Sequence, residues 1–303
     1  NSDGHKGRPG ASYPGSSLFG AIGGLTCFLS KNLSREGIID SINKRHHYAT
    51  SGGPTGRMYI DLKANFTSEG LVFHDDPKLF DTKGRNSKQA IMGDIVNLPN
   101  GEMSLNISVS TAVAIERLDI FNGSELIETF KPFSEKDLGN RIRVIWEGAE
   151  YRGRFRQTVW DGEAEIYNNE ILNSNPINFF NPDKSLSNTT NKIKWEALTT
   201  GNFGGFDLIL KDPYKGEIEI RTPLITKKVN IEDINYEDKV FDKSNILPRF
   251  LKIFRLPLKN EIKKINLKRN IKLNDIGDNP IFIRLTQEDG TLAWTSPIYV
   301  YRS

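Results

Sequence analysis

The sequence predicts an α+β protein in which a short βα step precedes a longer, mainly antiparallel, sandwich-like β region. Near the N-terminus, apolar residues recur at helical spacing. Beyond Arg57 they alternate with polar residues in short runs, and Asn, Gly, Asp and Pro clusters separate these runs. We therefore divide the chain into residues 1–63 and residues 64–303.

The first region opens with a candidate metal site, Asp3 and His5, in front of a glycine-rich loop. If this segment ends a strand, both side chains leave the same face, where a carboxylate and an imidazole can reach one cation. The alternative is that Asp3 caps a turn and His5 lies on the surface. Arg8 follows and is assigned to substrate binding, because a guanidinium beside a metal can bind a phosphate in bidentate fashion. A surface loop is the alternative for Arg8 and is favoured for Lys6.

One helix is predicted from Arg35, with Ser34 as its N-cap. Ile38, Ile39 and Ile42 recur at helical spacing, and basic residues occupy the last turn, where the helix dipole favours positive charge. A single βα step cannot close a barrel. Its apolar face is therefore expected to pack against something outside this chain.

Three further histidines are candidate functional residues. His46 and His47 close the predicted helix, and we assign His46 to substrate binding, as a general acid or a supporting residue. The alternative for this pair is a C-terminal cap and a packed ring. His74 could join Asp75 and Asp76 in a calcium-like or other metal site, and an ordinary turn is the favoured alternative.

The β region contains two clear hairpin signals and one basic stretch. The hairpins are predicted to turn at Asn122-Gly123 and around Asp289-Gly290. Nine basic residues occur between residues 249 and 272, against the single acid Glu261. Alternation there favours strands with a solvated basic face, and binding of an anionic polymer or membrane surface is the alternative.

Composition narrows the function classes. The chain has 303 residues, 37% of them hydrophobic, and a net charge of +3, which is too small to argue for nucleic-acid binding. No apolar run approaches the roughly 20 residues that span a bilayer. Cys27 is the only cysteine, so an intramolecular disulfide is impossible. For the four tryptophans, core packing is favoured over stacking on sugars.

Four segments together resemble a known family. NSDGHKGRPGASYPG looks like a last metal-binding motif, and LSREGIIDSINKRHHYATSG looks like a final barrel helix and the strand after it. RIRVIWEGAEYRGRFRQTVWDG and IFIRLTQEDGTLAWTSPIYV look like a C-terminal β region. The family that these segments resemble is the PHP superfamily (polymerase and histidinol phosphatase), particularly a large branch filed as a domain of unknown function.

The resemblance implies a TIM-like barrel with a cluster of two or three metal ions and a metal-bound hydroxide that attacks a phosphoester. Residues 1–63 would be the C-terminal remnant of this barrel, with Asp3 and His5 matching the last ligand pair for zinc, manganese or iron. We therefore expect part of a metal-dependent phosphoesterase that is inactive by itself. The alternative is a non-catalytic β-sandwich module, attached to an inactive barrel, that binds a glycan or a protein partner.

Overall fold

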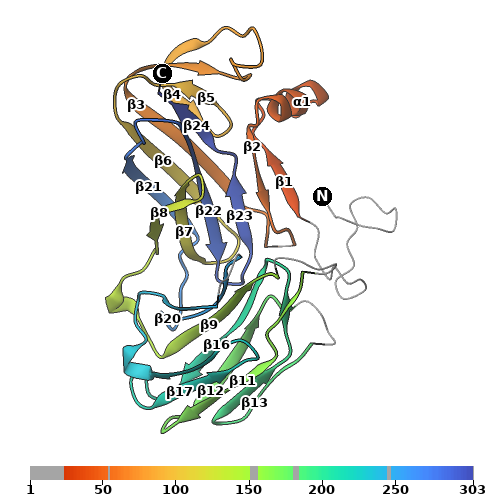
Figure 1. Ribbon diagram of the computed structural model, residues 1–303, viewed down its shortest axis with the longest axis vertical. Coiled ribbons are helices and arrows are strands. Elements are labelled where there is room, and N and C mark those ends of the chain that lie inside the picture. Colours follow the sequence, from red (N-terminus) through yellow and green to blue (C-terminus); the bar gives the residue numbers. More distant parts are fainter. Residues whose placement is uncertain (1–23, 54, 151–155, 180–183, 244–246, 303) are drawn as a thin grey trace. The chain divides into compact units, whose positions relative to one another are not determined.

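The computed structural model describes residues 24–53, 55–150, 156–179, 184–243 and 247–302. Over these ranges the protein is built mainly of β-strands, with a single α-helix, α1 (Arg35–Asn43) (Figure 1). The chain divides into two compact units. Unit 1 holds the described residues of 22–132 and 261–303, and unit 2 holds those of 133–260.

Unit 1 contains a sheet of twelve strands whose main path runs β1-β2-β23-β22-β24-β5-β3-β6-β21. The strands are β1 (Leu25–Phe28), β2 (His47–Thr50), β3 (Tyr59–Phe73), β4 (Arg85–Ile91), β5 (Ile95–Asn97), β6 (Met103–Ser110), β7 (Ile115–Asn122), β8 (Glu125–Phe130), β21 (Lys264–Ile271), β22 (Asp278–Gln287), β23 (Leu292–Thr295) and β24 (Ile298–Tyr301). β24 and β5 form a parallel pair that links the β22 side of the sheet to the β3 side.

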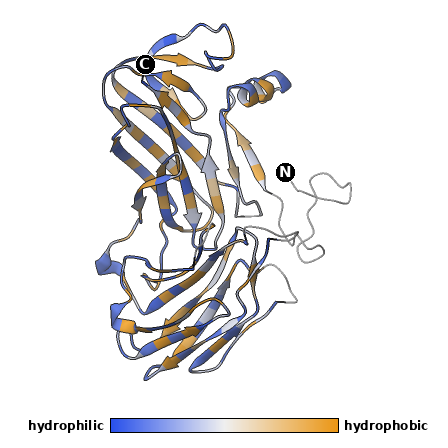
Figure 2. Cartoon of the chain, viewed as in Figure 1, coloured by the Kyte–Doolittle hydropathy of each residue, from blue (hydrophilic) through white to orange (hydrophobic). Residues whose placement is uncertain are grey.

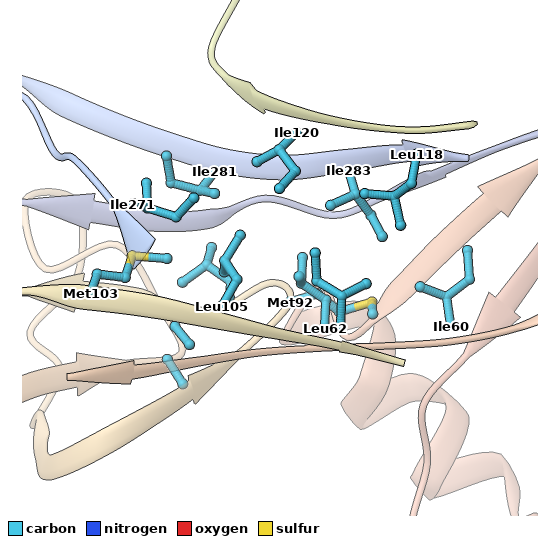
Figure 3. Close-up of a cluster of buried hydrophobic side chains, with 14 of the residues drawn as sticks. Ile60, Leu62, Met92, Met103, Leu105, Leu118, Ile120, Ile271, Ile281 and Ile283 are labelled. Atoms are coloured by element: carbon cyan, nitrogen blue, oxygen red, sulfur yellow. The ribbon is translucent and has the colours of Figure 1, made fainter. Parts of the chain in front are cut away.

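The core of unit 1 lies between these two parts of the sheet. Figure 3 shows Leu62 and Leu105, from β3 and β6, opposite Ile120 and Ile283, from β7 and β22, and all four side chains are fully buried. Apolar and polar residues alternate along β3 and β6 (Figure 2), so one side of each strand enters the core and the other faces outward.

Unit 2 contains two antiparallel sheets of five strands, β13-β14-β11-β17-β18 and β12-β16-β9-β20-β19, and the short pair β10-β15. Its strands are β9 (Arg141–Gly148), β10 (Thr158–Val159), β11 (Gly162–Tyr167), β12 (Ile171–Ile177), β13 (Leu186–Asn188), β14 (Lys192–Trp195), β15 (Leu198–Thr199), β16 (Phe203–Leu210), β17 (Glu217–Arg221), β18 (Thr226–Asn230), β19 (Lys239–Asp242) and β20 (Arg249–Leu256). The 3-10 helices Glu135–Asp137 and Ile231–Asp233 also belong to this unit.

The two sheets of unit 2 share an aromatic core, as a β-sandwich requires. Trp146 of β9 stacks on Trp195 of β14, with ring centroids 5.2 Å apart and planes at 7°. Trp160 is also fully buried, and its indole N–H donates to Thr199 Oγ1 at 2.9 Å. Core packing is therefore confirmed for these three tryptophans, whereas Trp294 in unit 1 is 37% exposed.

The predicted α+β class with a barrel remnant is wrong. β1 and β2, the strands that flank α1, pair antiparallel with each other, and β2 pairs antiparallel with β23. The strands of a TIM barrel all run parallel, and no closed barrel forms among the described residues. Helical spacing predicts a helix but not the direction of the strands around it. The expected boundary at residues 63 and 64 also falls inside β3.

Local predictions agree with the structure at several points. α1 begins at Arg35, and the Ser34 hydroxyl accepts the N–H of Gly37 at 3.0 Å. The hairpins turn as expected, with positive φ at Gly123 (59°) and Gly290 (86°). The basic stretch between residues 249 and 272 forms strands, as predicted, with β20 in unit 2 and β21 in unit 1.

Candidate metal centre

Three side chains that commonly bind metals meet in unit 1, and we call them the His-His-Asp cluster: His46, His74 and Asp94. Their ligand atoms all lie within 4.8 Å of one another. His46 Nε2 is 2.9 Å from Asp94 Oδ1, and His74 Nδ1 is 3.3 Å from the same oxygen. The two imidazole rings are nearly perpendicular, with centroids 5.7 Å apart.

The end of α1 positions His46. Lys44 caps the helix, and Arg45 takes a left-handed conformation (φ 59°) that turns the chain toward β2. The His46 N–H then donates to the Ser41 carbonyl at 2.9 Å. The Arg45 guanidinium supports this unusual backbone, because its Nε donates to the Gly93 carbonyl at 3.0 Å.

The turn between β4 and β5 positions Asp94. Gly93 has a φ of 93°, and a Cβ there would lie 2.4 Å from the Arg45 carbonyl oxygen, so the turn approaches the helix end closely only with glycine. Asp94 Oδ2 accepts the N–H of Ile91 at 2.9 Å. This bond fixes the buried carboxylate and leaves Oδ1 directed at the two histidines.

His74 follows the last residue of β3, and its carbonyl accepts a hydrogen bond from the Arg45 guanidinium. Its side chain is 41% exposed, but the Nδ1 atom is itself covered and makes no hydrogen bond of good geometry. Burial, with help from Lys44 and His46, lowers the pKa of His74 and outweighs the opposing attraction of Asp94. The ring therefore favours the neutral form, which is the form that binds metals.

The donor set of this cluster suits a borderline divalent ion. Two imidazole nitrogens and one carboxylate oxygen are ligands of zinc, iron and manganese, and they are rarely the whole shell of magnesium or calcium. Three protein ligands leave at least one position for water or substrate. The protein thus contains a group of residues able to hold a metal ion, and the sequence indicated its two histidines without their shared carboxylate.

The predicted site residues have different outcomes. Asp3, His5 and Arg8 lie outside the described residues. The structure brings His46 to Asp94, and its role in substrate binding stays a prediction.

The structure also bears on the predictions for His47 and His74. The His47 ring contacts Phe28 edge-on at 5.9 Å, as expected of a packed ring. Asp76 accepts the N–H of Lys78 at 2.8 Å, in the turn predicted beside His74. His74 joins Asp94 and not the neighbouring Asp75 and Asp76.

Sequence reasoning missed Asp94. The Gly93-Asp94 pair between two alternating runs signals a turn, and nothing in that signal indicates that two histidines will face the carboxylate. His46 and His74 were each recognised as candidates, so the missing information was their proximity.

Comparison with known proteins gives no relative: no family model, curated protein or solved structure matches this chain. The resemblance to the PHP superfamily therefore stays a prediction. In the part of the chain that the structure describes, no helix has the length and apolar character needed to cross a membrane.

Proposed function

We propose that unit 1 binds one divalent first-row transition metal ion, zinc in the first place, through His46 Nε2, His74 Nδ1 and Asp94 Oδ1. The observation that carries the proposal is the mutual approach of three ligand atoms to within 4.8 Å. Tetrahedral zinc with bonds of about 2.0–2.1 Å separates its ligand atoms by about 3.3 Å. The observed separations of 2.9 and 3.3 Å to Asp94 Oδ1 are close to this value.

A simple ion pair between His46 and Asp94 is the alternative, and it accounts for only part of the cluster. Such a pair needs one histidine, whereas a second imidazole nitrogen lies 3.3 Å from the same carboxylate oxygen. The covered His74 Nδ1 without a well-formed hydrogen bond is a group that a metal ion would satisfy.

Hydrolysis is the second candidate function, favoured by the incomplete ligand shell and by the partial exposure of His74. A metal ion with an open position lowers the pKa of a bound water and supplies hydroxide near neutral pH. The phosphoesterase hypothesis is therefore kept as a proposal, with Asp3, His5 and Arg8 as further candidate residues. The expectation of an inactive chain considered only Asp3 and His5 as ligands, whereas the His-His-Asp cluster offers three candidate ligands of its own.

Zinc titration by calorimetry tests the binding proposal. We expect one ion per chain, with affinity at least about 100-fold weaker in His46→Ala and His74→Ala, because loss of a mere supporting residue already costs 10–100-fold. His47→Ala is the matched control, since this adjacent histidine packs on Phe28 outside the cluster. Wild-type affinity in both cluster variants, or an equal loss in the control, would contradict the assignment.

Binding should also depend on pH. Protons compete with the metal for the imidazole nitrogens, so apparent zinc affinity should fall as the solution is made more acidic. Equilibrium dialysis at pH 7.5 and pH 5.5 measures this. Affinity that is unchanged between these two values would exclude histidine ligands. The visible absorption of cobalt bound in place of zinc would report the coordination geometry.

Turnover of bis(p-nitrophenyl) phosphate with zinc, manganese or iron tests the hydrolytic role. We expect metal-dependent release of p-nitrophenol that His74→Ala abolishes without changing the circular dichroism spectrum. Asp3→Ala and His5→Ala then test whether these residues contribute. Tight zinc binding without turnover would leave the metal site intact as a conclusion and refute the hydrolytic role on this substrate class.

A further inference from the structure

The side of unit 1 opposite its core carries an extended polar surface. We define the polar face as every second residue from Tyr59 to Asn65 on β3, from Ser104 to Ser110 on β6, and from Lys264 to Asn270 on β21. Strand register places these residues in rows across the sheet, for example Lys63 beside Asn106 and Asn106 beside Lys268. The intervening residues of the three strands supply the core, except Arg269, which pairs with Glu128.

The composition of the polar face is not explained by strand formation. It carries the four asparagines Asn65, Asn106, Asn266 and Asn270, and asparagine is depleted in β-strands. A face that is merely solvated is better served by threonine or other strand-favouring polar residues. The side chains of Asn106 and Asn270 form no hydrogen bond with other described residues, so their amides are available to a ligand.

The charge of the polar face is positive and partly unpaired. Its one carboxylate, Asp61, binds Lys63 at 2.6 Å. Lys264 and Lys268 have no ion pair among the described residues. They stand four residues apart on one strand, which separates them by about 13 Å. A small anion cannot reach both, whereas a polymer with repeated negative charges can.

One end of the polar face borders a shallow hollow of about 520 Å³, which Tyr59 and Ser110 help to line. Arg57 also lines it and has no acidic partner within the described part of the chain. Tyr59 is 55% exposed and offers an aromatic ring at this end. Positive charge and one flat ring thus continue the polar face into the hollow.

We propose that the polar face binds an acidic polysaccharide of the polyuronate class. Lysines pair with uronate carboxylates, and amide groups, which are donors and acceptors at once, pair with sugar hydroxyls. A single-stranded nucleic acid would need several rings for base stacking, and Tyr59 is the one aromatic side chain on the face. This proposal is independent of the metal centre.

Affinity electrophoresis in gels that contain polygalacturonate tests the proposal, with EDTA present so that no metal ion bridges protein and polymer. We expect the polymer to retard the protein and neutral dextran to leave it unretarded. Lys264→Glu/Lys268→Glu should weaken the affinity for polygalacturonate at least about tenfold. The control Lys194→Glu/Lys211→Glu changes the net charge equally in unit 2, at two lysines that are 63% and 61% exposed, and should bind like wild type.

Asn106→Ala/Asn270→Ala separates recognition of hydroxyls from simple charge attraction, and we expect it to weaken binding about threefold or more. Thermal melts check that every variant is folded. Absence of retardation, equal losses in the two lysine variants, an asparagine variant that binds like wild type, or single-stranded DNA retained as strongly as polygalacturonate would each overturn the proposal.

Discussion

The outer sheet faces of the two units differ in how far their charged side chains are paired with one another. On the β11, β14, β17 and β18 face of unit 2, Glu163 binds Lys192 at 2.9 Å and Arg221 at 3.0 Å, and Glu217 binds Lys228 at 2.6 Å. On the polar face of unit 1, Lys264 and Lys268 have no acidic partner among the described residues. Both faces are formed by antiparallel neighbouring strands whose other side packs against a core.

This difference indicates what each surface is for. Charges that are matched within one sheet satisfy one another and gain little from a ligand. Unmatched lysines and amides keep their hydrogen-bonding capacity for another molecule. Unit 2 also pairs opposite charges in its interior. There Asp207 accepts hydrogen bonds from Arg141 and Arg143, and all three residues are buried. The matched charges on the outer face of unit 2 therefore suit a structural role, and the unmatched lysines of unit 1 suit the ligand binding that we propose there.

The largest expected effect comes from breaking the internal compensation of unit 2. Asp207→Asn should destabilise the protein by about 3–5 kcal/mol, because two buried guanidinium groups lose their carboxylate. Trp146, Trp160 and Trp195 all lie in the core of unit 2, so urea unfolding followed by tryptophan fluorescence measures the loss.

Asp119→Asn is the matched variant in unit 1. Asp119 is equally buried, but its partner Arg284 is 31% exposed and can turn to water, so we expect a smaller cost of about 1–3 kcal/mol. If both variants lost the same free energy of unfolding, the two units would not differ in how strongly they depend on a buried carboxylate.

Unfolding in acid should test whether the buried carboxylate of Asp207 in unit 2 is ionised. Burial opposes ionisation of Asp207, but Arg143 and Arg141 outweigh it and hold its pKa below the usual 3.8. A carboxylate with a lowered pKa in the folded state stabilises the protein above its unfolded pKa, and this stabilisation is lost as pH falls through the folded value. The tryptophan signal of wild type should therefore stay native at pH 4 and change only below it. A transition that starts well above pH 4 would argue against this ionised cluster.

A smaller effect is expected from the outer face of unit 2. Arg221→Ala removes a cation that contacts Glu163, Glu165 and Glu219, so the melting temperature should fall slightly. The fall should shrink in 1 M salt, where charges are screened within about 3 Å. A salt-independent loss would instead assign Arg221 a packing role.

The smallest effect is expected on the polar face of unit 1. Lys264→Glu/Lys268→Glu should leave the melting temperature unchanged, since neither lysine has a partner to lose within the described chain. Differential scanning calorimetry measures this. A clear destabilisation would mean that these lysines support the fold, and it would remove the distinction between the two faces.

The sequence by itself determined the local structure. Alternating apolar residues predicted the strands that follow Arg57, and glycines placed the hairpin turns at Gly123 and Gly290. Ser34 predicted the start of α1, and the tryptophans of the alternating runs predicted core positions. Each of these features depends on neighbours within a few residues, where side-chain period and turn chemistry act directly.

Only the tertiary structure decided which distant segments meet. The same helical pattern at α1 fits a parallel barrel unit and an antiparallel hairpin, and the pairing of β2 with β1 and β23 selected the second. Likewise, His46 and His74 became a candidate metal centre only because the β4–β5 turn brings Asp94 to them. A local pattern fixes which face of a strand is apolar, whereas its partner and direction are set by long-range pairing that buries both faces together.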